Sequence, residues 1–260
     1  MDELSDAQFH RYARHLILDE IGEAGQAKLL AARVLVVGAG GLGSPLLLYL
    51  AAAGVGRLGI VDDDLVELSN LQRQVIHTSD RIGRAKVESA AAGLRALDPA
   101  LTLDLHHERL DAGNVARLVE PYDIVADGSD NFATRYLVND ACVAAGKTFV
   151  SGAILRFEGQ LSTFKPHEGA AHPCYRCLFP EPPPADAVPR CEEAGILGAV
   201  AGVIGTLQAA EVLKEILGLG QTLSGTLLLY DSLATEFYRV AIPRDPECAA
   251  CGTARRPMTN

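Results

Sequence analysis

The clearest pattern in the chain is an apolar run over residues 33–37, which breaks into glycine-rich sequence and resumes as apolar residues 45–53. The first run is rich in valine, which predicts a strand that is buried on both faces. The second run predicts a buried helix. The sequence therefore predicts a strand, a tight turn and a helix start, and the turn contains Gly38, Gly40, Gly41 and Gly43.

This turn has the features of a nucleotide site. Glycines allow a phosphate to approach the backbone, and the first turn of a helix favours an anion. A second predicted strand over residues 57–61 ends at Asp62, whose carboxylate can accept a ribose hydroxyl. The alternative is a strand-to-helix turn without a ligand. The chain has no GxxxxGK[ST] sequence, so ATP binding would need basic side chains from elsewhere.

Further strands and helices alternate along the chain, which predicts an α/β fold with a doubly wound, mostly parallel sheet and a Rossmann-like nucleotide site. Strands near residue 160 and residue 230 predict an antiparallel extension, followed by a tail that zinc would hold to the body. We interpret residues 1–260 as a single domain without an interdomain linker. Its parts are N-terminal helices (1–32), a nucleotide-binding core (33–158) and a sheet extension with a crossover loop and zinc site (159–260).

Polar residues follow the predicted strands where ligands bind in open α/β sheets. The loop after Asp62 contains Asn70 and Arg73, and Lys86 lies in the first turns of a helix that begins near Asp80 and runs to residue 97. A cation at a helix start opposes the helix dipole, which suggests a bound anion. Asp130 follows another strand and is a candidate Mg²⁺ ligand, with the N-cap of the next helix as the alternative.

The composition excludes several classes of function. The 260-residue chain is 48% hydrophobic with a net charge of −10, so we expect no general affinity for nucleic acid or anionic membranes. The acidic N-terminus does not resemble a secretion signal, and we expect a cytoplasmic protein. The uncharged residues 194–210 are too few for a membrane span and favour a buried helix.

The cysteines divide by spacing. Two CxxC pairs predict a structural zinc site with four thiolate ligands and no open position, the alternatives being redox dithiols or unpaired thiols. Cys142 lies within a predicted helix and is interpreted as a core thiol. Cys191 follows a proline-rich segment, where it is either a reactive thiol or simply exposed. The four predicted zinc ligands are Cys174, Cys177, Cys248 and Cys251.

Taken together, the glycine turn, residues 69–74, Lys86, residues 127–131, the CxxC pairs and Cys191 resemble the MoeB/ThiF family, with molybdopterin-synthase adenylyltransferases as the nearest branch. The resemblance extends from about residue 9 to residue 251. It implies an adenylyltransferase that uses ATP and Mg²⁺ to adenylate the C-terminal glycine of a ubiquitin-like sulfur-carrier protein ending in Gly-Gly. The acyl adenylate then receives sulfur and becomes a thiocarboxylate.

The resemblance also implies roles for individual residues. Asp62 binds the ribose, Arg73 and Lys86 bind the phosphates, and Asp130 binds Mg²⁺. Arg14 reaches the ATP site of the other protomer, so the resemblance implies a homodimer. Cys191 forms a covalent link to the carrier in some branches of the family only. The implied nucleotide contacts are Gly38, Gly40, Gly41, Gly43, Asp62, Ser69, Asn70, Leu71, Gln72, Arg73, Lys86, Asp130 and Asn131.

Several alternatives remain open from the sequence. An NAD-dependent oxidoreductase would use the glycine turn and Asp62, but would leave Arg73, Lys86 and Asp130 without roles. A tRNA-linked carboxylate as substrate and a non-catalytic scaffold are further alternatives. The carrier could serve molybdopterin synthesis, thiazole synthesis for thiamine, or tRNA thiolation, and length and zinc motifs favour the first. No rhodanese-like segment follows the zinc motif, so we expect a separate persulfide donor.

Overall fold

A single mixed sheet organises the protein, and its strand order is β3-β2-β1-β4-β5-β6-β7-β8. The computed structural model describes residues 4–184 and 194–252. The first five strands pair in parallel, and the others extend the sheet in antiparallel fashion. The strands are β1 (Arg33–Val37), β2 (Arg57–Val61), β3 (Thr102–His106), β4 (Ile124–Asp127), β5 (Thr148–Leu155), β6 (Glu158–Phe164), β7 (Thr226–Asp231) and β8 (Glu236–Ala241).

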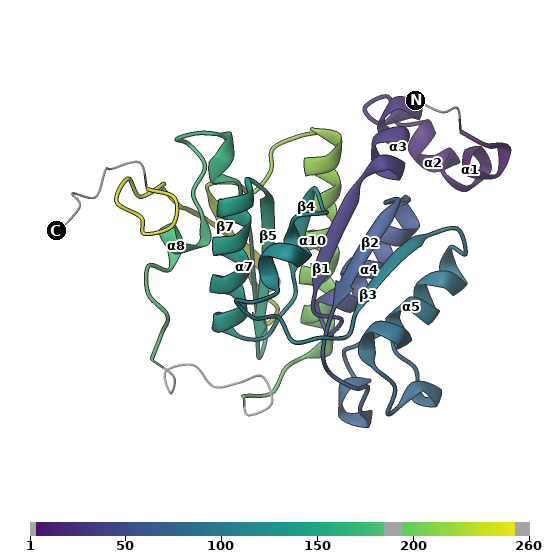
Figure 1. Cartoon of the computed structure of the whole chain (residues 1–260), viewed down its shortest axis with the longest axis horizontal. Coiled ribbons are helices and arrows are strands. Elements are labelled where there is room, and N and C mark those ends of the chain that lie inside the picture. Colours follow the sequence, from purple (N-terminus) through teal and green to yellow (C-terminus); the bar gives the residue numbers. More distant parts are fainter. Residues whose placement is uncertain (1–3, 185–193, 253–260) are drawn as a thin grey trace.

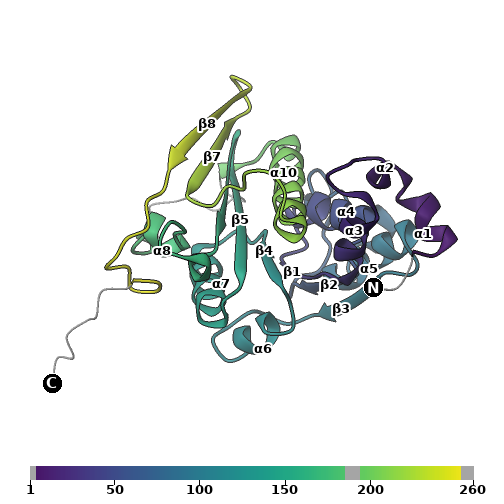
Figure 2. The ribbon, with the colours of Figure 1, turned by 90° about the horizontal axis from the view of Figure 1, so that it is seen from above.

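Helices cover both faces of the sheet (Figures 1 and 2), which confirms the predicted doubly wound α/β fold. Val36 packs in one core with residues of α4, α5 and α10, whereas Leu35 packs in a second core with residues of α6, α7 and α8. The helices are α1 (Asp6–Arg11), α2 (Ala13–Leu16), α3 (Gly22–Ala31), α4 (Gly43–Ala53), α5 (Lys86–Leu97), α6 (Val115–Val119), α7 (Phe132–Ala145), α8 (Tyr175–Leu178) and α10 (Gly198–Leu217).

The sheet reverses its winding between β1 and β4. The chain moves outward from β1 to β2 and β3, then returns to place β4 on the other side of β1. The loops after β1 and β4 therefore meet at one edge of the sheet. A side chain on Gly38 would lie 3.1 Å from the carbonyl oxygen of Gly128. Ligands bind at such topological switch points in open α/β sheets, because the diverging loops leave a crevice there.

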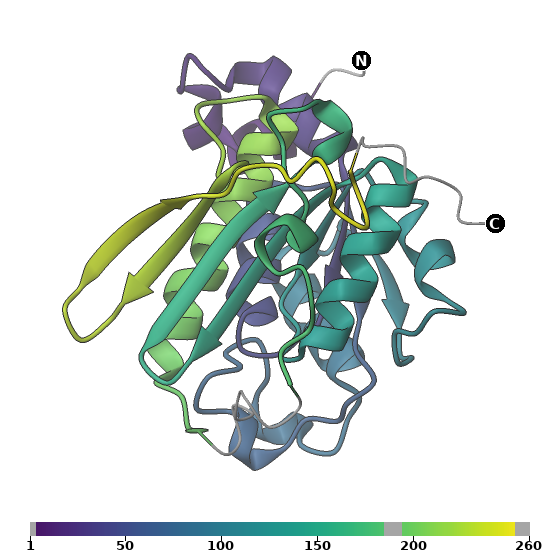
Figure 3. The ribbon, with the colours of Figure 1, turned by 90° about the vertical axis from the view of Figure 1, so that its left-hand side faces the viewer.

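The antiparallel strands form the predicted extension. Strand β6 pairs with β5 and β7, and the β7–β8 hairpin projects from the body (Figures 2 and 3). Every residue of β8 is exposed. Helix α10 packs against β5 and β6 as well as α4, so one long helix joins the extension to the nucleotide-binding core. Within the described part of the chain, no helix is both long and apolar enough to cross a membrane.

Some predicted element boundaries were wrong. The N-terminal helix is interrupted at Tyr12, which is buried and separates α1 from α2. Helix α3 begins three residues before the predicted Gly25, and α5 begins only at Lys86, because a 3-10 turn (η2, Ser79–Arg81) precedes it. The buried helix predicted over residues 194–210 runs instead from Gly198 to Leu217.

Candidate functional site

The glycine turn after β1 is held in a tight, preformed shape. Gly38 has a φ of +91°, a conformation that favours glycine. A Cβ atom on Gly43 would lie 1.9 Å from the carbonyl oxygen of Gly38, so any side chain there would prevent the turn from closing. The Ser44 hydroxyl donates a hydrogen bond to the Gly40 oxygen at 2.7 Å. The turn leads directly into α4, whose first backbone N–H groups favour an anion.

Asp62, at the end of β2, holds this turn from the neighbouring strand. Its two carboxylate oxygens accept hydrogen bonds from the backbone N–H groups of Ala39 and Asp64, at 2.8 and 2.9 Å. Burial raises the pKa of the Asp62 carboxyl, while Lys86 and both N–H groups oppose that shift. Each oxygen has a second lone pair, so Asp62 can still accept a hydrogen bond from a ligand hydroxyl.

Residues 67–74 form a compact loop around Asn70, which the short η1 turn (Leu68–Asn70) buries. The Asn70 amide oxygen accepts a hydrogen bond from the Glu67 N–H at 3.0 Å. Arg73 donates to the Ser69 carbonyl oxygen at 3.0 Å, and Ser69 donates to the Glu67 carboxylate at 3.3 Å. In this structure Asn70 therefore shapes the loop, and Arg73 packs beside Gly41 of the glycine turn.

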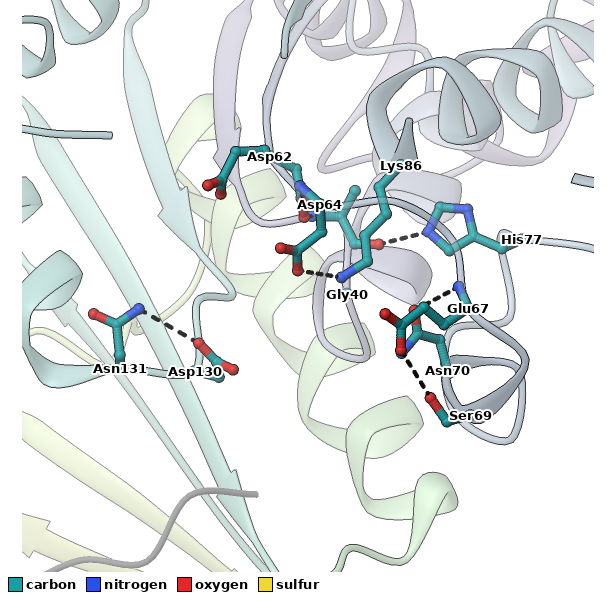
Figure 4. A network of polar contacts seen from close by, with 12 residues as sticks. Gly40, Asp62, Asp64, Glu67, Ser69, Asn70, His77, Lys86, Asp130 and Asn131 are labelled. Atoms are coloured by element: carbon teal, nitrogen blue, oxygen red, sulfur yellow. Dashed lines mark hydrogen bonds and ion pairs between the residues drawn. The ribbon is translucent and has the colours of Figure 1, made fainter. Parts of the chain in front are cut away.

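Lys86 is the first residue of α5, and its side chain is only 8% exposed. The ammonium group forms an ion pair with Asp64 at 2.7 Å, but the Asp64 side chain is 65% exposed. A buried cation with one solvated partner retains part of its field for another anion. Figure 4 shows the Lys86–Asp64 ion pair beside Gly40 of the glycine turn.

His77 is part of this site, although sequence reasoning did not single it out. It is 5% exposed, and its Nε2 and Nδ1 atoms each lie 2.8 Å from a partner, the Ala39 carbonyl oxygen and the Ser89 hydroxyl. A carbonyl only accepts, so Nε2 carries the proton and Nδ1 accepts from Ser89. His77 thus links the glycine turn to α5. The sequence around His77 contains no motif that predicts this link.

Acid should lower the stability of the folded protein through His77. Burial, together with Lys86 and Arg81, lowers the pKa of His77 despite the Ala39 hydrogen bond. The unfolded chain therefore takes up a proton near pH ~6.5 that the folded protein resists, so the free energy of unfolding should fall as the pH drops below that value. In the His77→Gln variant, we expect the free energy of unfolding to fall less steeply as the pH drops. Urea unfolding at several pH values would measure it. If the free energy of unfolding had the same dependence on pH in the wild type and the variant, this expectation would be contradicted.

Asp130 and Asn131 follow β4 on the other side of the crevice (Figure 4). Asn131 caps α7, since its side chain accepts a hydrogen bond from the Thr134 N–H at 2.9 Å. The alternative that made Asp130 the N-cap was therefore wrong by one residue. Asp130 is exposed, and within the described part of the chain its carboxylate accepts a single long hydrogen bond, from the Asn131 amide nitrogen at 3.4 Å. Its carboxylate is available for a cation.

A buried polar cluster fixes the loop that carries Asp130. Asp127 is fully buried, accepts a hydrogen bond from the Ser129 N–H at 2.9 Å and lies 3.7 Å from Arg135. Arg135 donates to the Ser129 carbonyl oxygen at 2.8 Å, and Gln208 of α10 donates to the Asp127 carbonyl oxygen at 2.8 Å. Sequence reasoning missed Arg135 and Gln208, although a glutamine within the uncharged stretch 194–210 was a possible signal.

The four predicted zinc ligands come together. Neighbouring sulfurs of Cys174, Cys177, Cys248 and Cys251 lie 3.5 to 3.9 Å apart, and all four lie within 4.8 Å of one another. Tetrahedral zinc with Zn–S bonds of about 2.3 Å would place its sulfurs about 3.8 Å apart. Hydrogen bonds involving the Cys174 thiol and the Asp245 N–H lower the pKa of Cys177, which favours its thiolate, whereas neighbouring Cys177 and burial raise the pKa of Cys174 and burial raises that of Cys251. The cluster fits zinc.

Of the remaining candidate residues, Arg14 lies apart from the crevice. Arg14 is exposed on α2, beyond the amino ends of the strands, because neighbouring Tyr12 contacts Asp98 after α5 and approaches Gly54 after α4. It therefore lies at the opposite end of the strands from the crevice of its own chain. Cys142 is buried, as predicted, and burial raises its pKa. Cys191 lies outside the described residues.

Comparison with known proteins connects this geometry to a family. Residues 12–250 match the sequence model of the ThiF family. The chain belongs to the ThiF family. This confirms the resemblance inferred from the motifs. Among solved structures, Escherichia coli MccB, in complex with MccA-N7isoASN, has a TM-score of 0.82 and 22% identity over 96% of this chain and 75% of that one. That similarity shows the shared fold.

Curated relatives of this ThiF-family chain have informative names. It is 55% identical to "Adenylyltransferase and sulfurtransferase MOCS3" of Sus scrofa, over 96% of the chain but 54% of that protein. The chain thus spans about half the length of such relatives. It is 50% identical to the sulfur carrier protein adenylyltransferase of Thermus thermophilus, over 94% of this chain and 91% of that protein. It is also 50% identical to the SAMP-activating enzyme E1 of Haloferax volcanii, over 96% of this chain and 91% of that protein.

Proposed function

We propose that this protein is an adenylyltransferase that uses ATP and Mg²⁺ to activate the C-terminal glycine of a ubiquitin-like sulfur-carrier protein. The main support is the meeting of the glycine turn, Lys86 and Asp130 at one crevice in a ThiF-family chain. The full-length similarity to a named sulfur carrier protein adenylyltransferase supports the choice of substrate. We further propose that residues 1–260 act as one domain, since one continuous sheet joins core and extension.

In this proposal the two sides of the crevice bind different parts of ATP. Asp62 accepts a ribose hydroxyl, while Lys86 and Arg73 contact the phosphates. Asp130, with a carboxylate free of strong partners, is the Mg²⁺ ligand. A bound Mg²⁺ would neutralise charge on the phosphates. The residues assigned to the nucleotide are Gly38, Gly40, Gly41, Gly43, Asp62, Ser69, Asn70, Leu71, Gln72, Arg73, Lys86, Asp130 and Asn131.

The reaction needs positioning more than proton transfer. The carrier carboxylate attacks the α-phosphorus of ATP, the bond from that phosphorus to the bridging oxygen breaks, and pyrophosphate leaves. The nucleophile is already ionised near neutral pH, so no general base is required. Both reactants are anions, and the buried Lys86 ammonium group lowers the repulsion between them. The acyl adenylate product carries the good leaving group that a carboxylate lacks.

The transfer of sulfur to the acyl adenylate needs groups outside the nucleotide site. We propose that sulfur arrives from a separate persulfide donor, since the cysteines in the described part of the chain are either clustered or buried in the core. Cys191 is the remaining candidate for a covalent link to the carrier. The carrier of molybdopterin synthesis is the first candidate, followed by those of thiazole synthesis and tRNA thiolation. All of these reactions would take place in the cytoplasm.

The proposal includes a homodimer, because Arg14 lies at the opposite end of the strands from the crevice of its own chain. We expect Arg14→Ala to reduce adenylation about tenfold, the effect of losing one charged contact of about 1.4 kcal/mol. The variant should unfold at the same temperature as the wild type, because the residue is exposed. Mixing it with a Lys86→Ala variant should restore activity through hybrid dimers. Unchanged activity of Arg14→Ala alone would contradict the partner-arm assignment.

ATP–pyrophosphate exchange tests the proposed function directly. The wild-type protein would be assayed with Mg²⁺ and each of two purified carriers ending in Gly-Gly, the molybdopterin-synthase small subunit and the thiazole sulfur carrier. Exchange stimulated by one carrier would support the reaction and identify the pathway. A folded protein that binds ATP but shows no exchange with either carrier would indicate another carboxylate substrate. Saturable NADH binding without any response to ATP would favour the oxidoreductase instead.

A further inference from the structure

Arg244, in the segment that follows β8, joins two distant parts of the backbone. Its Nη1 atom donates hydrogen bonds to the carbonyl oxygens of Pro166 and Gly169, at 2.9 and 2.7 Å. Its Nη2 atom donates to the carbonyl oxygen of Cys251, at 2.5 Å. The planar guanidinium group therefore connects the turn after β6 to a member of the cysteine cluster.

The positive charge of Arg244 has no acidic partner of its own. Within residues 4–184 and 194–252, no carboxylate forms an ion pair with it, and its three hydrogen bonds end on neutral carbonyl oxygens. Arg176 of α8 differs in this respect, because it forms two hydrogen bonds of 2.7 Å with the Asp140 carboxylate. A half-buried cation without a counter-ion calls for a physical reason.

The charge of the cysteine cluster supplies that reason. Four thiolates bound to one Zn²⁺ form a doubly negative centre, because each thiolate carries a negative charge. Three of the four cysteines are buried, so water stabilises the excess charge poorly. A cation held beside the cluster would offset it.

The segment that contains Arg244 touches the cluster at two ligands. Arg244 contacts the backbone of Cys251, and the N–H of the next residue, Asp245, donates to the Cys177 sulfur at 3.5 Å. The contacts with Pro166 and Gly169 hold the guanidinium group from the opposite side. The cation is therefore fixed next to the cluster before any metal binds, and little conformational entropy remains to be lost.

We propose that Arg244 is the counter-ion of the zinc–thiolate centre and increases its affinity for zinc. The guanidinium group does not bind the metal. It stabilises the negative charge that four thiolates leave in excess. The proposal is independent of the proposed adenylation, since it requires only that the cysteine cluster binds zinc. Loss of a contact that supports a metal ligand typically weakens metal binding by about 10–100-fold.

The test separates the charge of the side chain from its shape. Arg244→Met removes both the charge and the hydrogen bonds, whereas Arg244→Lys keeps the charge but loses the planar fork. Arg239→Met, on exposed β8, is the control for a positive charge lost elsewhere. Zinc affinity of each full-length protein would be measured by competition with a chelator. The absorption spectrum with Co²⁺ would show whether the four sulfurs still bind tetrahedrally.

We expect Arg244→Met to bind zinc about tenfold more weakly than the wild type, with an unchanged Co²⁺ spectrum. Arg244→Lys should stay within about threefold of the wild-type affinity, because the charge remains. Arg239→Met should also stay within about threefold, since water and salt screen an exposed charge. If Arg244→Met does not fold, the zinc affinity of Arg244→Lys decides the question by the same criterion.

Three results would overturn the assignment of Arg244. Wild-type zinc affinity in Arg244→Met would show that the charge does not act on the centre. An equal loss in Arg244→Met and Arg244→Lys would show that only the hydrogen bonds matter. A changed Co²⁺ spectrum in Arg244→Met would mean that the side chain shapes the site instead. ATP–pyrophosphate exchange is a separate measurement, so each of these results leaves the proposed function intact.

Discussion

Replacing Lys86 with alanine should reduce carrier-dependent ATP–pyrophosphate exchange by about 10²–10³-fold, the range found when one preorganised electrostatic contact to a reacting centre is removed. The Lys86 side chain is 8% exposed, so water screens its charge poorly. It also stands at the first residue of α5, where the helix dipole disfavours a cation. These costs are offset when an anion binds beside it.

A matched control is available two residues away. Arg84 carries the same charge but is exposed, so Arg84→Ala should retain exchange within about twofold, as expected for a screened surface charge. The partner of Lys86, Asp64, is largely solvated, so Lys86→Ala should fold normally. Circular dichroism and thermal unfolding would check this. Exchange at the wild-type rate in a folded Lys86→Ala protein would remove Lys86 from the phosphate site.

The second large effect concerns the cysteine cluster, which we expect to bind about one zinc ion per chain. Cys174 and Cys248 are 74 residues apart in sequence, so a shared metal closes a long loop. By analogy with a cross-link of that length, Cys248→Ser should lower the free energy of unfolding by about 4 kcal/mol. Metal analysis and urea unfolding would measure both quantities.

Cys142→Ala serves as the control for the zinc experiment. Cys142 is a buried thiol outside the cluster, so its replacement tests loss of a core side chain without loss of a metal ligand. This variant should retain zinc, and its loss of stability should not depend on added chelator. In the wild-type protein, a chelator should reproduce the effect of Cys248→Ser. A metal-free wild type of full stability would refute the zinc site.

The comparison of sequence and structure separates two kinds of information. Local patterns identified the glycine turn, because only a few residue types permit a strand to turn sharply into a helix. They also identified Asp62 and the CxxC pairs, since spacing alone restricts their chemistry. The first and last residues of the helices were predicted less accurately. Helix α5 was expected to begin earlier than Lys86, because its tertiary contacts, such as the ion pair with Asp64, are not visible in sequence.

The sequence by itself determined the fold class, the nucleotide turn and the set of four cysteines, because these depend on local residue types and on periodic burial. Tertiary structure alone decided which buried polar groups meet. His77 contacts a residue 38 positions away, and Gln208 contacts one 81 positions away. Hydrogen bonds act over a few ångströms of space, whatever the separation along the chain.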